Sequence, residues 1–129
     1  MTPYRYRRSR PIKLKQLTGP IESVSGPMIY AGVIGPDFGH QLTQSIGRLW
    51  TAAEFPDAEL AFVGASPEFT ELPGYFIDVI RSLGVTNPMR LLHAAVTVER
   101  LVVPRDLCNL HRRPSVDPGF ASWLRDHRP

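Results

Sequence analysis

The stretch MIYAGVIGPDFGHQLTQSIGRLW, residues 28–50, decides the fold of this chain. Its first part, residues 28–34, is a short apolar run between Gly-Pro pairs, which is typical of a strand buried on both faces. After the loop GPDFG, apolar residues recur at spacings of four, three and four, which predicts one stripe of an α-helix. That stripe consists of Leu42, Ile46, Leu49 and Ala53.

The rest of the chain continues this alternation. Residues 59–64 (ELAFVG) read as a second strand, and residues 67–83 read as a helix with Pro73 in its first turn and Gly84 as its stop. Two further strands are expected at 89–95, with His93 packed inside, and at 97–104. A short helix is expected at 117–126. This order predicts an α/β fold, a Rossmann-like three-layer domain with a mainly parallel sheet.

The chain of 129 residues is long enough for one domain. Its basic residues are concentrated at the start, since six precede the first acidic residue, whereas nine basic and twelve acidic residues follow from position 16. We therefore divide it into a basic, extended lead-in over 1–25 and an α/β domain over 26–129. Such a lead-in is either a solvated terminus or an arm for anionic partners. No specific nucleic-acid partner is expected.

Several classes of protein are excluded by what the sequence lacks. A single cysteine, Cys108, permits no internal disulfide, and we expect it to be a small buried hydrophobe. The basic start is followed by no apolar signal-peptide core, and no run reaches the ~18 apolar residues of a membrane span. We therefore expect a soluble, cytoplasmic protein. No metal-ligand spacing, phosphate loop or nucleophile elbow is present.

The loop GPDFGH lies at the carboxyl end of the first strand, where ligands gather in parallel α/β sheets. Asp37 either caps the helix or faces a ligand. At about 100° per residue, His40 points away from the apolar stripe, with Gln44 one turn further on and Arg48 beyond it. The helix dipole favours a neutral imidazole, the form that accepts a proton. His40 is therefore either a surface residue or a candidate general base.

The same stretch resembles the N-terminal motif of glycosyltransferase family 61, the capsular polysaccharide biosynthesis-like proteins. Segments 55–64 (FPDAELAFVG) and 99–104 (ERLVVP) also resemble strands of that family, and the resemblance spans about residues 26–125. The matching motif positions are Gly39, His40, Leu42, Ser45, Ile46, Arg48, Leu49 and Trp50.

The resemblance implies the N-terminal, acceptor-side half of a GT-B glycosyltransferase. It implies inverting transfer of a sugar from a nucleotide sugar to a saccharide or other hydroxyl acceptor, in polysaccharide or glycan biosynthesis. His40 would be the catalytic base, and Asp37, Gln44 and Arg48 would bind substrate. No metal and no cofactor is implied, since the nucleotide sugar is the donor substrate.

Two departures from the family pattern shape this expectation. Gln44 stands where the family has an acidic residue, and the sequence given ends at Pro129, where a donor-binding half would follow. We therefore expect a fragment that is inactive alone and needs a donor-binding domain in cis or from a partner chain. A homo-oligomer is compatible with this expectation. The alternative is a non-catalytic α/β binding or interaction module derived from such an enzyme.

Overall fold

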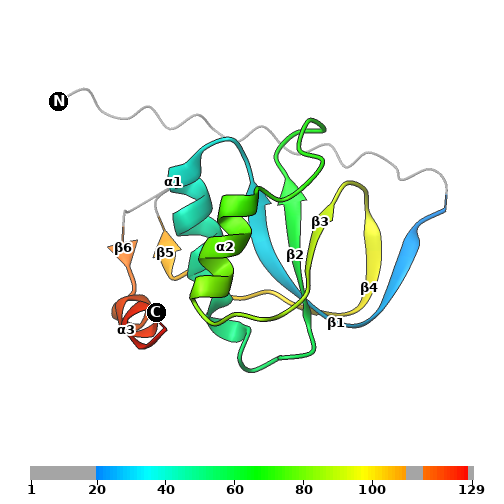
Figure 1. Cartoon of the computed structure of the whole chain (residues 1–129). Coiled ribbons are helices and arrows are strands. Elements are labelled where there is room, and N and C mark those ends of the chain that lie inside the picture. Colours follow the sequence, from blue (N-terminus) through cyan, green and yellow to red (C-terminus); the bar gives the residue numbers. More distant parts are fainter. Residues whose placement is uncertain (1–19, 110–114, 128–129) are drawn as a thin grey trace.

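The computed structural model of the chain describes residues 20–109 and 115–127, apart from the side chains of three residues (Figure 1). Four parallel strands form one sheet in the order β3-β2-β1-β4. The predicted α/β class with a parallel sheet is therefore confirmed. The strands are β1 (Glu22–Ile34), β2 (Glu59–Gly64), β3 (Met89–Leu92) and β4 (Val96–Val102).

Short helices connect and follow these strands. Asp117 caps the last helix by accepting a hydrogen bond from the Gly119 amide at 2.8 Å, as its Asp-Pro start predicts. The second helix begins at Gly74, directly after Pro73, so it is shorter than predicted. The helical elements are α1 (Phe38–His40), the π-helical turn η1 (Gln41–Ser45), the 3-10 helix η2 (Ile46–Thr51), α2 (Gly74–Ser82) and α3 (Pro118–Asp126). A small antiparallel pair, β5 (Cys108–Asn109) and β6 (Ser115–Val116), precedes α3.

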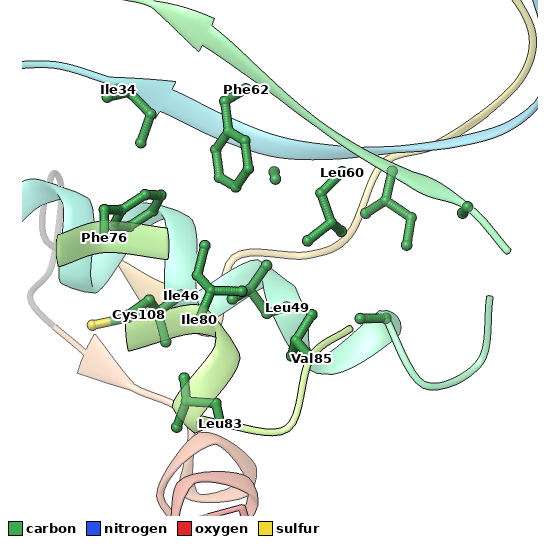
Figure 2. Close-up of a cluster of buried hydrophobic side chains, with 14 of the residues drawn as sticks. Ile34, Ile46, Leu49, Leu60, Phe62, Phe76, Ile80, Leu83, Val85 and Cys108 are labelled. Atoms are coloured by element: carbon green, nitrogen blue, oxygen red, sulfur yellow. The ribbon is translucent and has the colours of Figure 1, made fainter. Parts of the chain in front are cut away.

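The hydrophobic core lies between one face of the sheet and the helices (Figure 2). The rings of Phe62 on β2 and Phe76 on α2 meet edge to face, with centroids 5.5 Å apart. Alternate residues of the two central strands point into this core, as a pleated strand requires. Its largest members are Ile29, Ile34, Leu49, Leu60, Phe62, Phe76 and Ile80.

The three-layer arrangement predicted from the sequence is not found among the described residues. Right-handed crossovers from β1 to β2 and from β2 to β3 move in one direction, so they place their helices on the same face. The connection from β3 to β4 is a turn over residues 93–95, with no helix to cover the other face. The described sheet therefore carries one helical layer.

The sheet is rolled because β1 bends near Gly26. The first half of β1 pairs with β4 and the second half with β2, and the β4 register shifts between Val24 and Pro27. Gly26 has a φ of 85°, and its amide donates to Glu99 Oε2 at 2.8 Å. The bend brings the start of β1 back toward β3. In Figure 1, the curved sheet lies on one side of the molecule, and α1 and α2 lie on the other.

An ion-pair cluster links β3 to the starts of β1 and β2. Arg90 on β3 donates to Glu59 Oε1 at 2.9 Å and to Glu22 Oε1 at 3.0 Å. The hydrogen bond that Arg90 donates to Glu59 is the largest cause that raises the Arg90 pKa. β1 begins at Glu22, which lies inside the segment 1–25 that the sequence assigns to the lead-in. Residues 1–19 lie outside the described part of the chain.

The first helical segment differs from the α-helix predicted for it. One α turn is followed by the π turn η1 and the 3-10 helix η2, so buried positions do not follow a single period. Ile46 and Leu49 are buried as predicted, whereas Ala52 replaces Ala53 in the core. The polar residues Gln41 and Ser45 are also buried.

The close crossing of this segment over β1 explains the small polar residue there. Gly32 has a φ of 104°, and a Cβ at this position would lie 3.1 Å from Ser45 Oγ. A glycine on the strand and a serine on the turn therefore let the two backbones approach.

No helix of the described residues is long and apolar enough to span a membrane.

Candidate functional site

Three loops meet at the carboxyl edge of the sheet, where ligands bind in parallel α/β folds. They follow β1 at residues 35–37, β2 at 65–73 and β3 at 93–95. The first two loops are joined by a hydrogen bond from the Ala65 amide to the Ile34 carbonyl at 2.8 Å. The loop GPDFGH therefore lies at the predicted edge, next to the loop after β2.

Two partly exposed aromatic rings stand beside the first loop. Phe38 and Tyr75 are 51% and 46% exposed, and their ring centroids lie 5.5 Å apart at a tilt of 55°. Phe38 begins α1 and Tyr75 lies in the first turn of α2, and Figure 1 shows these helices side by side. We call Phe38 and Tyr75 the aromatic pair.

A buried glutamine fixes the aromatic pair. Gln41 is 1% exposed and accepts a hydrogen bond from Tyr75 Oη at 2.6 Å. Its amide nitrogen donates to the Gly35 carbonyl. Both ends of the amide are thus satisfied, as a buried polar group requires. Gln41 therefore holds the loop after β1 and the Tyr75 ring in one arrangement, a role that sequence reasoning missed.

Asp37 and His40 belong to the same loop and helix start. Asp37 Oδ1 accepts a hydrogen bond from the Gly39 amide at 2.9 Å, which is the capping contact considered for it. The backbone of His40 ends α1, and its side chain lies outside the described part of the structure. Gln44 is half-buried in η1. Whether the His40 imidazole faces this loop stays a prediction.

Arg48 has its partners within the chain. Its Nη1 donates to the Pro104 carbonyl at 2.9 Å, and its Nη2 lies 3.7 Å from Asp106 Oδ2. The guanidinium carbon also stands 5.3 Å above the centre of the Tyr30 ring. The segment after β4 therefore holds both terminal nitrogens of Arg48, whereas the buried Nε has no hydrogen-bond partner among the described residues.

Gly47 and Trp50, which lie close to Arg48 in the chain, also contact the segment after β4. Trp50 Nε1 donates to the Arg105 carbonyl at 3.0 Å, and the Leu107 amide donates to the Gly47 carbonyl at 3.2 Å. We call these contacts, together with those of Arg48, the motif clasp. The motif residues Arg48 and Trp50, together with Gly47, therefore tie η2 to the chain that leaves β4.

Two cavities lie near the loops after β2 and β3. The sheet cavity, about 460 Å³, occupies the inside of the rolled sheet, opposite the helices. The edge cavity, about 290 Å³, lies at the carboxyl ends of β2 and β3, and both cavities are lined by Gly64, Leu92 and His93. The sheet cavity is further lined by Met28, Tyr30, Ala61, Val63, Ala94, Ala95, Val96, Val98 and Leu101, and the edge cavity by Ala65, Ser66, Pro67 and Phe69.

The prediction that His93 packs inside a strand is wrong. β3 ends at Leu92, and His93 begins the exposed turn to β4. The bend of β1 brings the start of β4 close enough for a short turn, and this bend is not visible in a count of apolar residues. The local sequence signal for the end of β3 is His-Ala-Ala, residues 93–95, which separates two runs of residues that favour strands.

The described residues contain no group of three His, Cys, Asp or Glu side chains that could hold a metal ion. Comparison with known proteins found no matching family model, no matching curated protein and no matching solved structure. The resemblance to family 61 therefore rests on the motif residues themselves.

Proposed function

We propose that this chain is the acceptor-side α/β unit of an inverting glycosyltransferase resembling family 61, in polysaccharide or glycan biosynthesis. The acceptor is a saccharide that binds at the loop after β1. The observation that carries the proposal is the aromatic pair, Phe38 and Tyr75, which stays exposed at the carboxyl edge of a parallel sheet.

An exposed, fixed aromatic pair suits a sugar ring. One face of a pyranose presents C–H groups that pack on aromatic carbon, while its hydroxyl groups need polar partners at the rim. Gln41 orients Tyr75 before any ligand arrives, which lowers the entropy cost of binding. The Asp37 carboxylate precedes Phe38 in the chain and is exposed, so it supplies hydrogen-bond acceptors at this rim.

His40 follows Phe38 by two residues and is the proposed base. Its neutral imidazole takes the proton of an acceptor hydroxyl while that oxygen forms a bond to the anomeric carbon of the donor. The bond from that carbon to the nucleoside diphosphate breaks, with inversion. Contacts to the donor come from a second α/β unit, in cis or from a partner chain.

Saccharide titration of the chain tests acceptor binding. A panel of oligosaccharides is followed by heteronuclear NMR, and we expect shifts at residues 35–41 and 74–76. Phe38→Ala combined with Tyr75→Ala abolishes these shifts, whereas Val116→Ala, which removes an equally exposed apolar side chain from β6, leaves them unchanged. Binding that survives the double substitution would contradict the proposed acceptor site.

The assigned base is tested by transfer from a panel of nucleotide sugars in an assembly that includes a donor-binding unit. His40→Ala should keep saccharide affinity and lose transfer. His127→Ala is the histidine control, because His127 stacks on Trp123 at the end of α3. Transfer by the His40→Ala variant would exclude this residue as the base.

A second candidate function is a non-catalytic saccharide-binding module derived from such an enzyme. Arg48 favours it, because this predicted substrate ligand is bound within the motif clasp. Gln44 favours it as well, since an amide cannot serve as a base at the position where the family has an acid. Saccharide binding without transfer in any assembly would select this module over the enzyme.

A further inference from the structure

The sheet cavity is a separate feature from the aromatic pair. Its walls come from the part of β1 after the bend, from the three other strands and from the turn over residues 93–95, so the rolled sheet borders it on several sides. Met28 and Ala61 point into it, away from the helices, yet they are only 1% and 2% exposed. The cavity is therefore a recess within the fold rather than a flat sheet face.

The size and lining of the sheet cavity suit a small apolar body. Its volume of about 460 Å³ lies within the range of small-molecule sites, roughly 300–1,000 Å³. Small side chains keep it open, since Ala61, Ala94 and Ala95 stand where larger residues would fill it. Val63 on β2 and Val96 and Val98 on β4 add further apolar surface.

The edge cavity gives the recess a polar end. It adjoins the sheet cavity through Gly64, Leu92 and His93, and it adds the hydroxyl of Ser66 and the backbone of the loop after β2. His93 lines both cavities and is exposed, so its ring N–H can donate to a group at the boundary. One end of the combined site is therefore apolar and the other can donate hydrogen bonds.

We propose that the two cavities form one binding site for a fatty acid of medium length. The acyl chain lies in the sheet cavity, and the carboxylate lies in the edge cavity, where it accepts hydrogen bonds from His93 and Ser66. An ionised carboxylate matches these donors, because it accepts hydrogen bonds and donates none. The site is independent of the saccharide site, since none of its lining residues belongs to the aromatic pair.

The test is calorimetric titration of the chain with decanoate and, separately, with decanol. We expect decanoate to bind and His93→Ala to weaken it about tenfold while decanol affinity stays the same. Val98→Thr places a hydroxyl in the cavity wall at constant size and should weaken both ligands. The matched control Val116→Thr makes the same change on an exposed side chain away from the cavity and should alter neither.

Ala61→Phe fills the cavity and should abolish binding of both ligands, with circular dichroism to check that the variant folds. If the Ala61→Phe variant does not fold, the difference in ligand affinity between the Val98→Thr and Val116→Thr variants tests the proposal. Absence of decanoate binding would overturn the proposal. Decanoate affinity in the Val98→Thr variant equal to that of the native protein would overturn it as well. A dimer seen by sedimentation that decanoate does not dissociate and that leaves no binding would have the same effect. The Phe38→Ala and Tyr75→Ala substitutions should leave decanoate affinity intact, so a failure of either proposal is seen separately.

Discussion

Asn87 joins two loops that lie far apart in sequence. Its side-chain nitrogen donates to the carbonyls of Phe55 and Ala58 at 2.9 and 3.0 Å, with Pro56 at 3.4 Å, and the residue is 4% exposed. These carbonyls lie just before β2, so the amide fixes where β2 and β3 enter the sheet. Nothing in the local sequence pattern indicates this role.

We predict that Asn87→Ala lowers the free energy of unfolding by about 1–3 kcal/mol, because buried carbonyls lose their donor. Urea denaturation followed by circular dichroism measures this change. Thr86→Ala, at the exposed neighbouring position, should change stability by no more than about 0.5 kcal/mol. Equal losses in the two variants would mean that the amide hydrogen bonds contribute little.

Cys108 is buried, as the sequence predicts, and burial together with the nearby Asp106 carboxylate raises its thiol pKa above the ordinary value of 9.0. The folded state therefore favours the protonated thiol. The stabilisation is complete below pH 9.0 and is lost as pH rises, because the unfolded chain releases this proton more easily.

We expect the unfolding free energy of the native protein to fall relative to that of Cys108→Ala as the pH rises above 9.0. The difference between the two proteins isolates the thiol from other groups that titrate at high pH. Denaturant titrations at several pH values supply both curves. Parallel curves would show that the thiol titrates alike in both states.

At the scale of elements, the motif clasp places η2 against the segment after β4. Gly47 lies at its centre, where a Cβ would stand 2.8 Å from Asp106 Oδ1 and 3.3 Å from Cys108 Cβ. Asp106 also accepts the Cys108 amide at 3.0 Å. A side chain at position 47 must therefore displace a carboxylate that holds both Arg48 and β5.

We predict that Gly47→Ala destabilises the fold by about 1–3 kcal/mol through this overlap. Gly74→Ala is the matched control, since a Cβ there meets nothing within 4 Å and α2 gains a better helix former. Thermal unfolding of both variants gives the comparison. A Gly47→Ala protein as stable as Gly74→Ala would show that the clasp is loose.

Local sequence signals are sufficient to predict several elements. Gly84 ends α2 with a φ of 77°, and Asp117 caps α3, because each acts through its own backbone and near neighbours. The middle of β1 is buried on both faces, at Met28 and Ile29, as its apolar run predicts. The loop before His40 likewise lies at the carboxyl edge.

The remaining features depend on contacts between distant segments. The π turn forms where Ser45 crosses Gly32, and no helical period in the sequence reports that crossing. The position of His93 depends on the bend at Gly26, which lies far away along the chain. The resemblance implies that Arg48 binds substrate, because spacing alone does not reveal its partners after β4.

One hydrophobic core links η2, α2 and α3 to the sheet across the whole molecule. Phe62 and Phe76 meet at its centre, and Phe120 extends it to α3. The chain has two tryptophans, Trp50 on η2 and Trp123 on α3, and the second packs against this core. Because the core is shared, we expect the described elements to unfold together.

Phe62 and Phe38 differ in how deeply they are buried. Phe62→Ala should lower the free energy of unfolding by about 3–5 kcal/mol, because the ring is fully buried and its loss leaves a cavity. Phe38→Ala should cost far less, since that ring is half exposed. Circular dichroism and tryptophan fluorescence should give coincident transitions in the native protein and in both variants. A separate fluorescence transition would show that η2 or α3, which carry the two tryptophans, unfolds on its own and that the core is divided.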